Sequence, residues 1–309
     1  MENNQYQQAV KEAVKGKFKG KRTLAAKNAP RFPASAEREM RRITIEYNNI
    51  LRQELKKGLP KVMNEYKKLR HNDSRFDDAR DLERLIRELF LDIAEAIEKR
   101  ISEFDLQYRL ARVGELARKT ALREWKRMVR ETLGVNLLDD YYNGSFYAES
   151  IDQWVSDNVL KIKSIPAGML DDMRQIITEG YMEGATIRDI QSRIQAEYNS
   201  NKSYAQFLAR DQVATLNAQI TQAQQRDAGV SRYKWSDSRD SRVRECHREF
   251  DGKIFSWDDP PEGWYYTKSK GRVYTGRKCH PGEDIGCRCV AIPVFDIDGI
   301  QIPMKGKSK

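Results

Sequence analysis

The sequence predicts a mostly α-helical protein, with an elongated helical body followed by a small, β-rich, zinc-binding module near the C-terminus. Three observations predict this arrangement. Apolar residues recur at three- and four-residue spacing over most of the first 230 positions, which is the period of an amphipathic helix. That spacing is lost beyond Val230, where aromatic residues stand among glycine, proline and aspartate. All four cysteines and two of the three histidines lie in the same last quarter of the chain.

The composition favours long helices with solvated faces over one deep core. The chain has 309 residues, of which 39% are hydrophobic and 33% charged, and its formal net charge is +10. A chain of this length is expected to form one large domain or two to three small ones. The positive charge suits a polyanionic partner, for which nucleic acid is the usual identity, although a generally basic soluble protein has the same composition.

The sequence contains neither the pattern of a secretory signal peptide nor a run of about 20 apolar residues that would span a membrane. We therefore expect a protein made and used in a reducing cytoplasm, or inside a particle assembled there. Disulfides are rare in that reducing compartment, so the crowded cysteines indicate a site of another kind.

Residues 1–33 are basic, contain few acidic or apolar residues, and end with Pro30 and Pro33. This composition predicts a flexible arm. Such an arm can bind a phosphate backbone or act only as a solubilising tail, and the sequence leaves both interpretations open. The residues predicted to contact nucleic acid are Lys11, Lys15, Lys17, Lys19, Lys21 and Arg22.

Residues 34–145 are predicted to form a helical N-terminal body. Ser35 is a plausible N-cap, and the helix that follows is expected to break or kink at Gly58 and Pro60. Two further one-sided apolar stripes occupy residues 82–104 and 110–129, and the second ends near Gly134. Stripes of this kind are typical of a helix-bundle core.

Residues 146–230 are predicted to form a second helical domain, because turn-forming residues at 136–150 mark a boundary before it. Pro166 is expected to begin a helix over 167–180. Thr186 and Asp189 resemble a capping box for a helix over 187–198, and a separate helix is predicted over 204–229.

Residues 231–296 form a module of about 65 residues. A domain this small buries little apolar surface and often needs a stabilising cross-link such as a bound metal ion. The predicted tetrahedral, structural zinc site is His247, His280, Cys287 and Cys289. Cys246 and Cys279 each adjoin a histidine and can replace one of these ligands. The spacing is not that of a standard zinc finger, so buried thiols with core histidines remain the alternative. Residues 297–309 are predicted to be a basic tail.

The module also carries an ordered series of short motifs. These motifs are Asp240-x-Arg242-Val243-Arg244-x-x-His247, Asp251-Gly252, His280-Pro281-Gly282 and Cys287-Arg288-Cys289. Together they resemble the C-terminal signature of the phage Mu protein F-like family, and the resemblance extends over roughly residues 100–296. Two features depart from the family pattern, namely an insertion at 264–277 and Cys279. We interpret Asp240, Arg242, Arg244, Asp251 and Gly252 as structural.

The resemblance implies a bacteriophage minor head protein that acts in head morphogenesis and has no enzymatic activity. It implies a place in the virion head interior near the portal vertex. The implied partners are the portal protein and packaged double-stranded DNA, bound without sequence preference, with scaffold or major capsid protein as further candidates. We assign the portal contact to the helical body, residues 34–230, and a structural role to the C-terminal module.

Two other classes of function remain open. Domains of this kind also occur in bacterial polymorphic toxins, and Asp240, His247, Glu249 and Asp251 cluster in the sequence, so the alternative is a zinc-dependent nuclease or toxin-type effector. A zinc deaminase is disfavoured because the Pro-Cys-x-x-Cys half of its motif is missing. A general nucleic-acid-binding module is suggested by basic and tyrosine residues at 265–277, but we favour a solvated hairpin, because aromatic-rich hairpins commonly bury their aromatic residues across strands.

Overall fold

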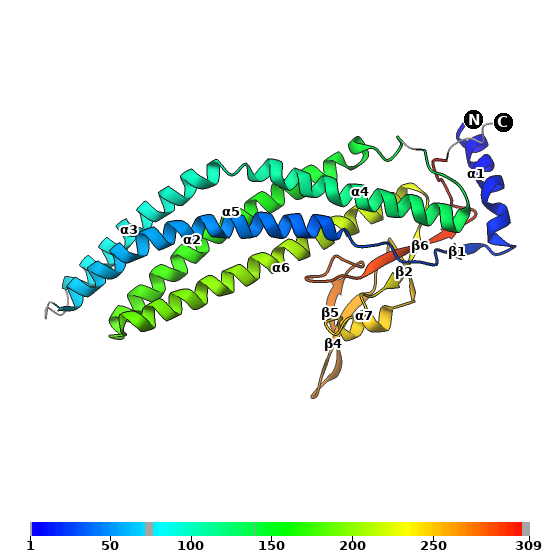
Figure 1. Ribbon diagram of the computed structural model, residues 1–309. Coiled ribbons are helices and arrows are strands. Elements are labelled where there is room, and N and C mark those ends of the chain that lie inside the picture. The colour runs from blue at the N-terminus through cyan, green and yellow to red at the C-terminus, as the bar shows by residue number, and fades with distance from the viewer. Residues whose placement is uncertain (1, 72–76, 139, 305–309) are drawn as a thin grey trace. The chain divides into compact units, whose positions relative to one another are not determined.

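The computed structural model describes residues 2–71, 77–138 and 140–304 (Figure 1). The chain divides into two compact units, and four of its helices contribute residues to both. Unit 1 contains Met1–Glu37, Val113–Trp154 and Arg210–Lys309, and unit 2 contains Arg38–Arg112 and Val155–Ala209. The long helices are α1 (Glu2–Phe18), α2 (Ala34–His71), α3 (Asp77–Ser102), α4 (Leu106–Leu133), α5 (Gly144–Met182) and α6 (Ile187–Asp227). A helical body followed by a strand-rich C-terminal region confirms the predicted fold class.

Unit 2 is a helix bundle whose core comes from α2, α3, α5 and α6. The predicted apolar stripes supply this core, because residues one or two turns apart face the same side of each helix. Leu51, Ile93 and Ile177 are each at most 5% exposed, and they belong to one continuous apolar cluster. The stripes of α2 and α3 are therefore bundle core, as the spacing indicates.

Helix α2 continues through Gly58 and Pro60, so the predicted break there is wrong. Packing explains why a weak helix former is kept at this position. A Cβ atom at Gly58 would lie 2.4 Å from Cδ1 and Cγ1 of the buried Ile93 side chain, so only glycine lets α3 approach this closely. Helix α5 likewise runs through Pro166, which does not begin a new helix.

Helix α6 is continuous, whereas two helices were predicted on either side of the polar stretch 199–203. The polar side chains there bond back to their own helix. The Asn201 side-chain amide donates to the Glu197 carbonyl at 3.1 Å, and the Ser203 hydroxyl donates to the Asn199 carbonyl at 3.0 Å. These bonds satisfy the polar groups without ending the helix. Its start is the predicted capping box, with Asp189 N–H donating to Thr186 Oγ1 at 3.2 Å.

The predicted flexible arm is instead part of unit 1. Residues 2–18 form α1, and Thr23–Ala25 form strand β1. Val10, Val14 and Phe18 stand four residues apart and are at most 2% exposed, so a short apolar stripe that the basic composition obscured holds α1 in place. The Tyr6 hydroxyl also bonds the far end of the described chain, donating to the Ile302 carbonyl at 2.9 Å.

The strand-rich region contains a four-stranded antiparallel sheet in the order β1-β6-β2-β3 and a separate β4-β5 hairpin. The strands beyond β1 are β2 (Arg232–Ser236), β3 (Ile254–Ser256), β4 (Glu262–Thr267), β5 (Gly271–Lys278) and β6 (Val290–Asp296). Tyr233 and Trp235 alternate inward on β2 and are fully buried. Because β1 pairs with β6, the N-terminal segment closes one edge of this sheet.

Helix α6 is tied to the sheet by buried hydrogen bonds within unit 1. The Gln225 side chain donates to the Ala291 carbonyl at 3.1 Å and accepts from the Trp257 indole at 3.3 Å. Asp211 accepts the Gly286 backbone N–H at 2.6 Å. These bonds fix the loop before β6, in which two of the cysteines lie.

Among the described residues, no helix is both long enough and apolar enough to cross a membrane. The last part of the predicted basic tail, residues 305–309, lies outside the described residues.

Candidate metal centre

Three of the predicted metal ligands meet inside the module. His247 lies on the short helix α7 (Glu245–Phe250), and Cys287 and Cys289 lie in the loop that leads into β6. All three side chains are at most 4% exposed. Their ligand atoms lie within 4.8 Å of one another, although 40 residues separate the histidine from the first cysteine.

The separations fit tetrahedral zinc. The Nδ1 atom of His247 lies 3.6 Å from Sγ of Cys287 and 3.7 Å from Sγ of Cys289. Zinc–sulfur and zinc–nitrogen bonds of about 2.3 and 2.0 Å at a tetrahedral angle place nitrogen and sulfur about 3.6 Å apart. Each thiol therefore lies at the distance from the imidazole nitrogen that one shared metal ion requires.

The surroundings of Cys287 favour a thiolate. A hydrogen bond from Cys289 is the largest cause that lowers the pKa of Cys287 to about 5; His247 also lowers it, while burial acts against the shift. The backbone N–H groups of Gly282 and Cys289 each donate to this sulfur at 3.4 Å. Thiolate is the form that binds metals, so the site is prepared for a cation.

The second ring nitrogen of His247 faces a different set of groups. Nε2 is buried without a hydrogen-bond partner and lies 3.9 Å from a carboxylate oxygen of Asp284. His247, Cys279 and Asp284 form a second possible ligand group. Asp284 also pairs with Arg244 at 3.2 Å and Arg277 at 3.7 Å. A carboxylate behind a ligating histidine is the usual way of fixing the orientation of the ring.

His280 is placed away from these groups. Its Nδ1 atom lies 3.0 Å from the Tyr233 hydroxyl, and its ring centroid lies 4.8 Å from that of Trp257. Burial is the main cause that lowers the pKa of His280, which favours a neutral ring. Neither ligand group found among the described residues includes His280. The predicted set of four ligands is thus brought together only in part, and sequence spacing offers no means of separating the two histidines.

Cys246 and Cys279, the two alternative ligands, differ in their placement. Cys246 packs in the aromatic cluster around Tyr233 and Trp235 and belongs to neither ligand group. Cys279 belongs to the second group, and burial raises the pKa of its thiol to about 12. A cavity of about 40 Å³ adjoins His247, Cys287 and Cys289, which is room for one water molecule.

The acids that suggested a nuclease all have local partners. Asp240 pairs with Arg288 and accepts the Arg242 N–H at 2.9 Å. Asp251 accepts the Asp237 N–H at 3.0 Å. Glu249 pairs with Arg272 of the hairpin at 2.6 Å.

The remaining signature residues shape the turns around the site. Arg244 donates to the Ile285 carbonyl at 2.6 Å, which ties the start of α7 to the cysteine loop. Gly252 has a φ of +77°, a conformation that favours glycine, and its N–H donates to the Trp235 carbonyl at 2.9 Å.

The basic residues predicted to bind nucleic acid lie on α1 and the turn after it. Lys15, Lys17 and Lys19 are exposed, while Arg22 pairs with Asp296 at 3.4 Å. A second basic region was not predicted. Arginine and lysine line a hollow along α4, and the signal for it is the recurrence of basic residues between 118 and 130.

The comparisons with known proteins concern the same part of the chain. Residues 171–292 match the family described as "Phage Mu protein F like protein". This match begins later than the roughly residue 100 expected from the motifs. No solved structure matches the chain.

Two curated relatives match about half of the chain. An uncharacterized protein of Haemophilus influenzae is 33% identical over 54% of this chain and 34% of its own length. The minor head protein GP7 of Bacillus phage SPP1 is 22% identical over 55% of this chain and 62% of its own length. The chain therefore spans less than two thirds of either relative. Residues 171–292, which include His247, Cys287 and Cys289, are thus similar to the phage Mu protein F-like family.

Proposed function

We propose that this chain is a minor head protein of a tailed bacteriophage and acts in head morphogenesis. We further propose that it lies in the head interior near the portal vertex, where it associates with the portal protein and with packaged DNA. The observation that carries the proposal is the family match over residues 171–292 together with the similarity to a phage minor head protein.

The proposal is tested by co-expressing the full chain with the portal protein encoded beside it and purifying the portal assembly through a tag on the portal. We expect the chain to co-purify in a fixed ratio and to be present in purified heads by mass spectrometry. Absence from both the portal assembly and the heads would contradict the proposed function.

The portal contact is assigned to the helical body. The part of the helical body in unit 2 has apolar side chains on its surface, including Leu91, which is 62% exposed, and Leu160, which is 70% exposed. Burial of such side chains is hydrophobic and therefore tolerant of salt. Leu91→Asp with Leu160→Asp should weaken portal association at high salt. The matched control is Ile254→Asp with Ile285→Asp, two module residues exposed to 51% and 57%, which should leave it unchanged. The reverse result would place the portal contact in the module.

For the module we propose a structural zinc held by Nδ1 of His247 and the thiolates of Cys287 and Cys289. Cys279 is the candidate for a fourth protein ligand, and Asp284 orients the histidine from its other nitrogen. Bound there, zinc would cross-link α7 to the loop before β6, and it would stabilise a module that has few strands.

A nuclease is the second candidate, because three protein ligands leave one position of a tetrahedral metal for water. The local pairing of Asp240, Glu249 and Asp251 favours the structural assignment. Incubating the zinc-loaded full chain with plasmid DNA tests the two. Cleavage that is lost in the His247→Ala variant would establish the nuclease, and intact plasmid supports the structural role.

A further inference from the structure

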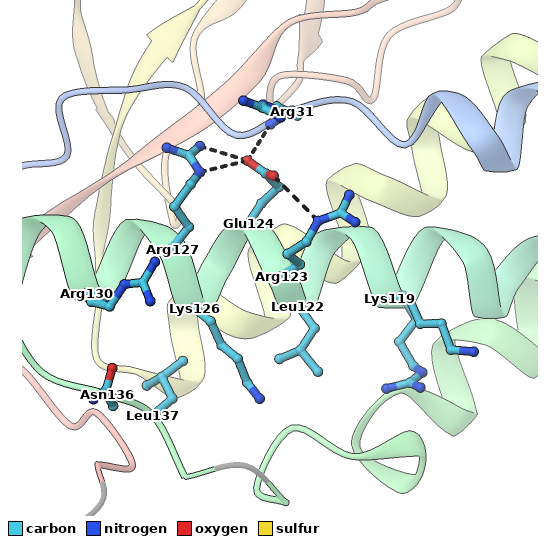
Figure 2. A pocket seen from close by; sticks show the side chains of 11 residues that line it. Arg31, Lys119, Leu122, Arg123, Glu124, Lys126, Arg127, Arg130, Asn136 and Leu137 are labelled. Atoms are coloured by element: carbon cyan, nitrogen blue, oxygen red, sulfur yellow. Dashed lines mark hydrogen bonds and ion pairs between the residues drawn. The ribbon is translucent and has the colours of Figure 1, made fainter.

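One hollow of unit 1 lies along α4 and is strongly basic. It has a volume of about 640 Å³ and is lined by seven cationic side chains and one acid. Figure 2 shows Lys119, Leu122 and Lys126 projecting from α4 on the side where Asn136 and Leu137 lie. The cationic residues are Arg31, Arg118, Lys119, Arg123, Lys126, Arg127 and Arg130.

A single buried acid organises one rim of this groove. The Glu124 side chain is 4% exposed and accepts the Arg31 backbone N–H at 3.1 Å. It also pairs with Arg127 at 2.7 Å and lies 3.9 Å from Arg123 (Figure 2). Arg127 is held a second time, by Glu131 at 3.0 Å. Glu124 thus holds the Arg127 side chain and the backbone at Arg31, and it lies close to Arg123, before any ligand arrives.

Positive charge predominates in the lining of the groove, which contains seven cationic side chains and one acid. Arg118 pairs with Glu115 at 2.6 Å, and the same carboxylate lies 3.4 Å from Lys119. Glu124 and Glu131 pair with Arg127 on the same helix. Lys119 and Arg123 remain 66% and 72% exposed. A concave surface lined by one sign of charge concentrates the opposite charge.

The dimensions favour a long polyanion. Basic residues from 119 to 130 recur every three or four positions, so they extend about 16 Å along the helix. One strand of duplex DNA presents a phosphate about every 3.4 Å along its axis, so this length matches several consecutive phosphates. An acidic peptide would instead need apolar anchor sites, and of the two leucines that line the groove Leu137 is only 3% exposed.

We propose that this α4 groove is a binding site for the phosphate backbone of double-stranded DNA. The proposal rests on the proposed function, in which the protein lies beside packaged DNA, and it places the contact on α4 in addition to the basic residues of α1. Because the contacts are made to phosphates, binding is independent of base sequence and strongly dependent on salt.

The test measures binding of the full chain to a short fluorescent duplex over a series of salt concentrations. The variant replaces Lys119, Arg123 and Arg130 with glutamine. The matched control replaces the exposed unit 2 residues Lys61, Lys163 and Arg188 with glutamine, which removes the same charge elsewhere. We expect the α4 variant to bind about tenfold or more weakly and the slope of log K against log salt to fall by about 2–3. The control variant should show the same slope of log K against log salt as the unaltered chain.

A second variant tests the groove without removing any cation. Asn136→Asp adds one negative charge to the groove wall with almost no change of shape, and Asn199→Asp is the matched control on α6. We expect weaker DNA binding only for the groove variant.

Three outcomes would overturn the α4 site. The first is an unchanged slope of log K against log salt in the α4 triple variant. The second is an equal loss of DNA affinity in the control variant. The third is displacement of DNA by polyglutamate at equal charge, which would identify an acidic-peptide site. Absence of DNA binding by the unaltered chain would also overturn it, whereas co-purification with the portal would still stand as the test of the proposed function.

Discussion

The Nδ1 atom of His247 lies 3.6 Å from the Sγ atom of Cys287, across 40 residues of sequence. The distance equals the separation expected between a nitrogen and a sulfur that share one zinc ion. Helix α7 holds one partner and the loop before β6 holds the other. A cross-link at this point would therefore join two segments that otherwise meet only through packing and a few polar contacts.

Metal content provides the first prediction. Protein purified without chelator should contain one zinc per chain, and His247→Ala or Cys287→Ser should lose it, because each removes a ligand atom. His280→Gln is the matched control, since His280 faces Tyr233 and should leave the zinc content unchanged. Elemental analysis of the four proteins measures this. Zinc retained in His247→Ala, or lost in His280→Gln, would contradict the assigned ligands.

Removal of the metal should unfold the module selectively. A strong chelator is expected to expose Trp235, which is buried with its ring centroid 5.1 Å from that of His247, while the far-ultraviolet helix signal changes little. Tryptophan fluorescence and circular dichroism recorded on the same sample distinguish the two effects. Cys279→Ser refines the assignment, since weaker zinc binding in this variant would make Cys279 the fourth ligand.

Close helix packing at Gly58 provides a prediction about unit 2. Gly58→Ala should lower the free energy of unfolding by about 1–3 kcal/mol, because the new methyl group collides with Ile93 and this outweighs the better helix propensity of alanine. In an Ile93→Ala background, the same substitution should become neutral or stabilising. Gly168→Ala on α5 is the control, since nothing lies within 4 Å of its added Cβ, and it should stabilise by up to about 1 kcal/mol. Additive effects in the double variant would contradict the contact.

A backbone contact at Gly229 provides a prediction about unit 1. A Cβ atom at Gly229 would lie 1.9 Å from the carbonyl oxygen of Gly299, and the residue has a φ of +73°. Gly229→Ala should therefore destabilise the sheet by about 2 kcal/mol or more, through both the clash and the left-handed conformation. Gly252 has a similar φ of +77°, but no atom lies within 4 Å of a Cβ added there. The Gly252→Ala variant therefore measures the cost of the left-handed conformation without a clash. Equal losses in the two variants, measured by chemical unfolding, would show that the clash contributes nothing.

An ion pair at Glu54 makes the stability of unit 2 depend on pH. Hydrogen bonds from Lys57, the largest cause, and from Arg100 lower the pKa of the Glu54 carboxyl. A carboxyl with a lowered folded-state pKa stabilises the fold above its unfolded pKa of about 4.3, and this contribution is lost as the pH falls through the folded-state value. Glu54→Gln should therefore lower the melting temperature at neutral pH, and the difference should shrink below about pH 4.

The control for Glu54 is Glu83→Gln, which breaks an exposed pair with Arg87 at 3.3 Å. Exposed pairs contribute about 0–1 kcal/mol, so this variant should melt close to the unaltered chain at every pH. A pH-independent difference for Glu54→Gln would show that its effect is one of packing and not of charge.

Local pattern alone determined a large part of this protein. The apolar stripes of α2 and α3 predicted the bundle core, because helical residues three and four apart must share a face. The capping box at Thr186 and the change of period after Val230 located a helix start and the beginning of the strand-rich region. The short Cys/His motifs indicated the resemblance to the phage Mu protein F-like family by themselves, because the order and spacing of motifs are properties of the sequence and need no contact between distant residues.

Only the tertiary structure decided which histidine meets the cysteines, since residues 40 positions apart are brought together by the packing of α7 and the loop before β6 and not by spacing. It also decided that α2, α5 and α6 continue through Pro60, Pro166 and the polar stretch 199–203. Packing against neighbouring helices outweighs local propensity, which amounts to only about 1–3 kcal/mol even for glycine and proline. The basic segment 1–33 has the composition of a flexible arm, yet it contains a folded helix and a strand. Val10, Val14 and Phe18 are buried, and β1 pairs with β6, whose residues lie far away in the sequence.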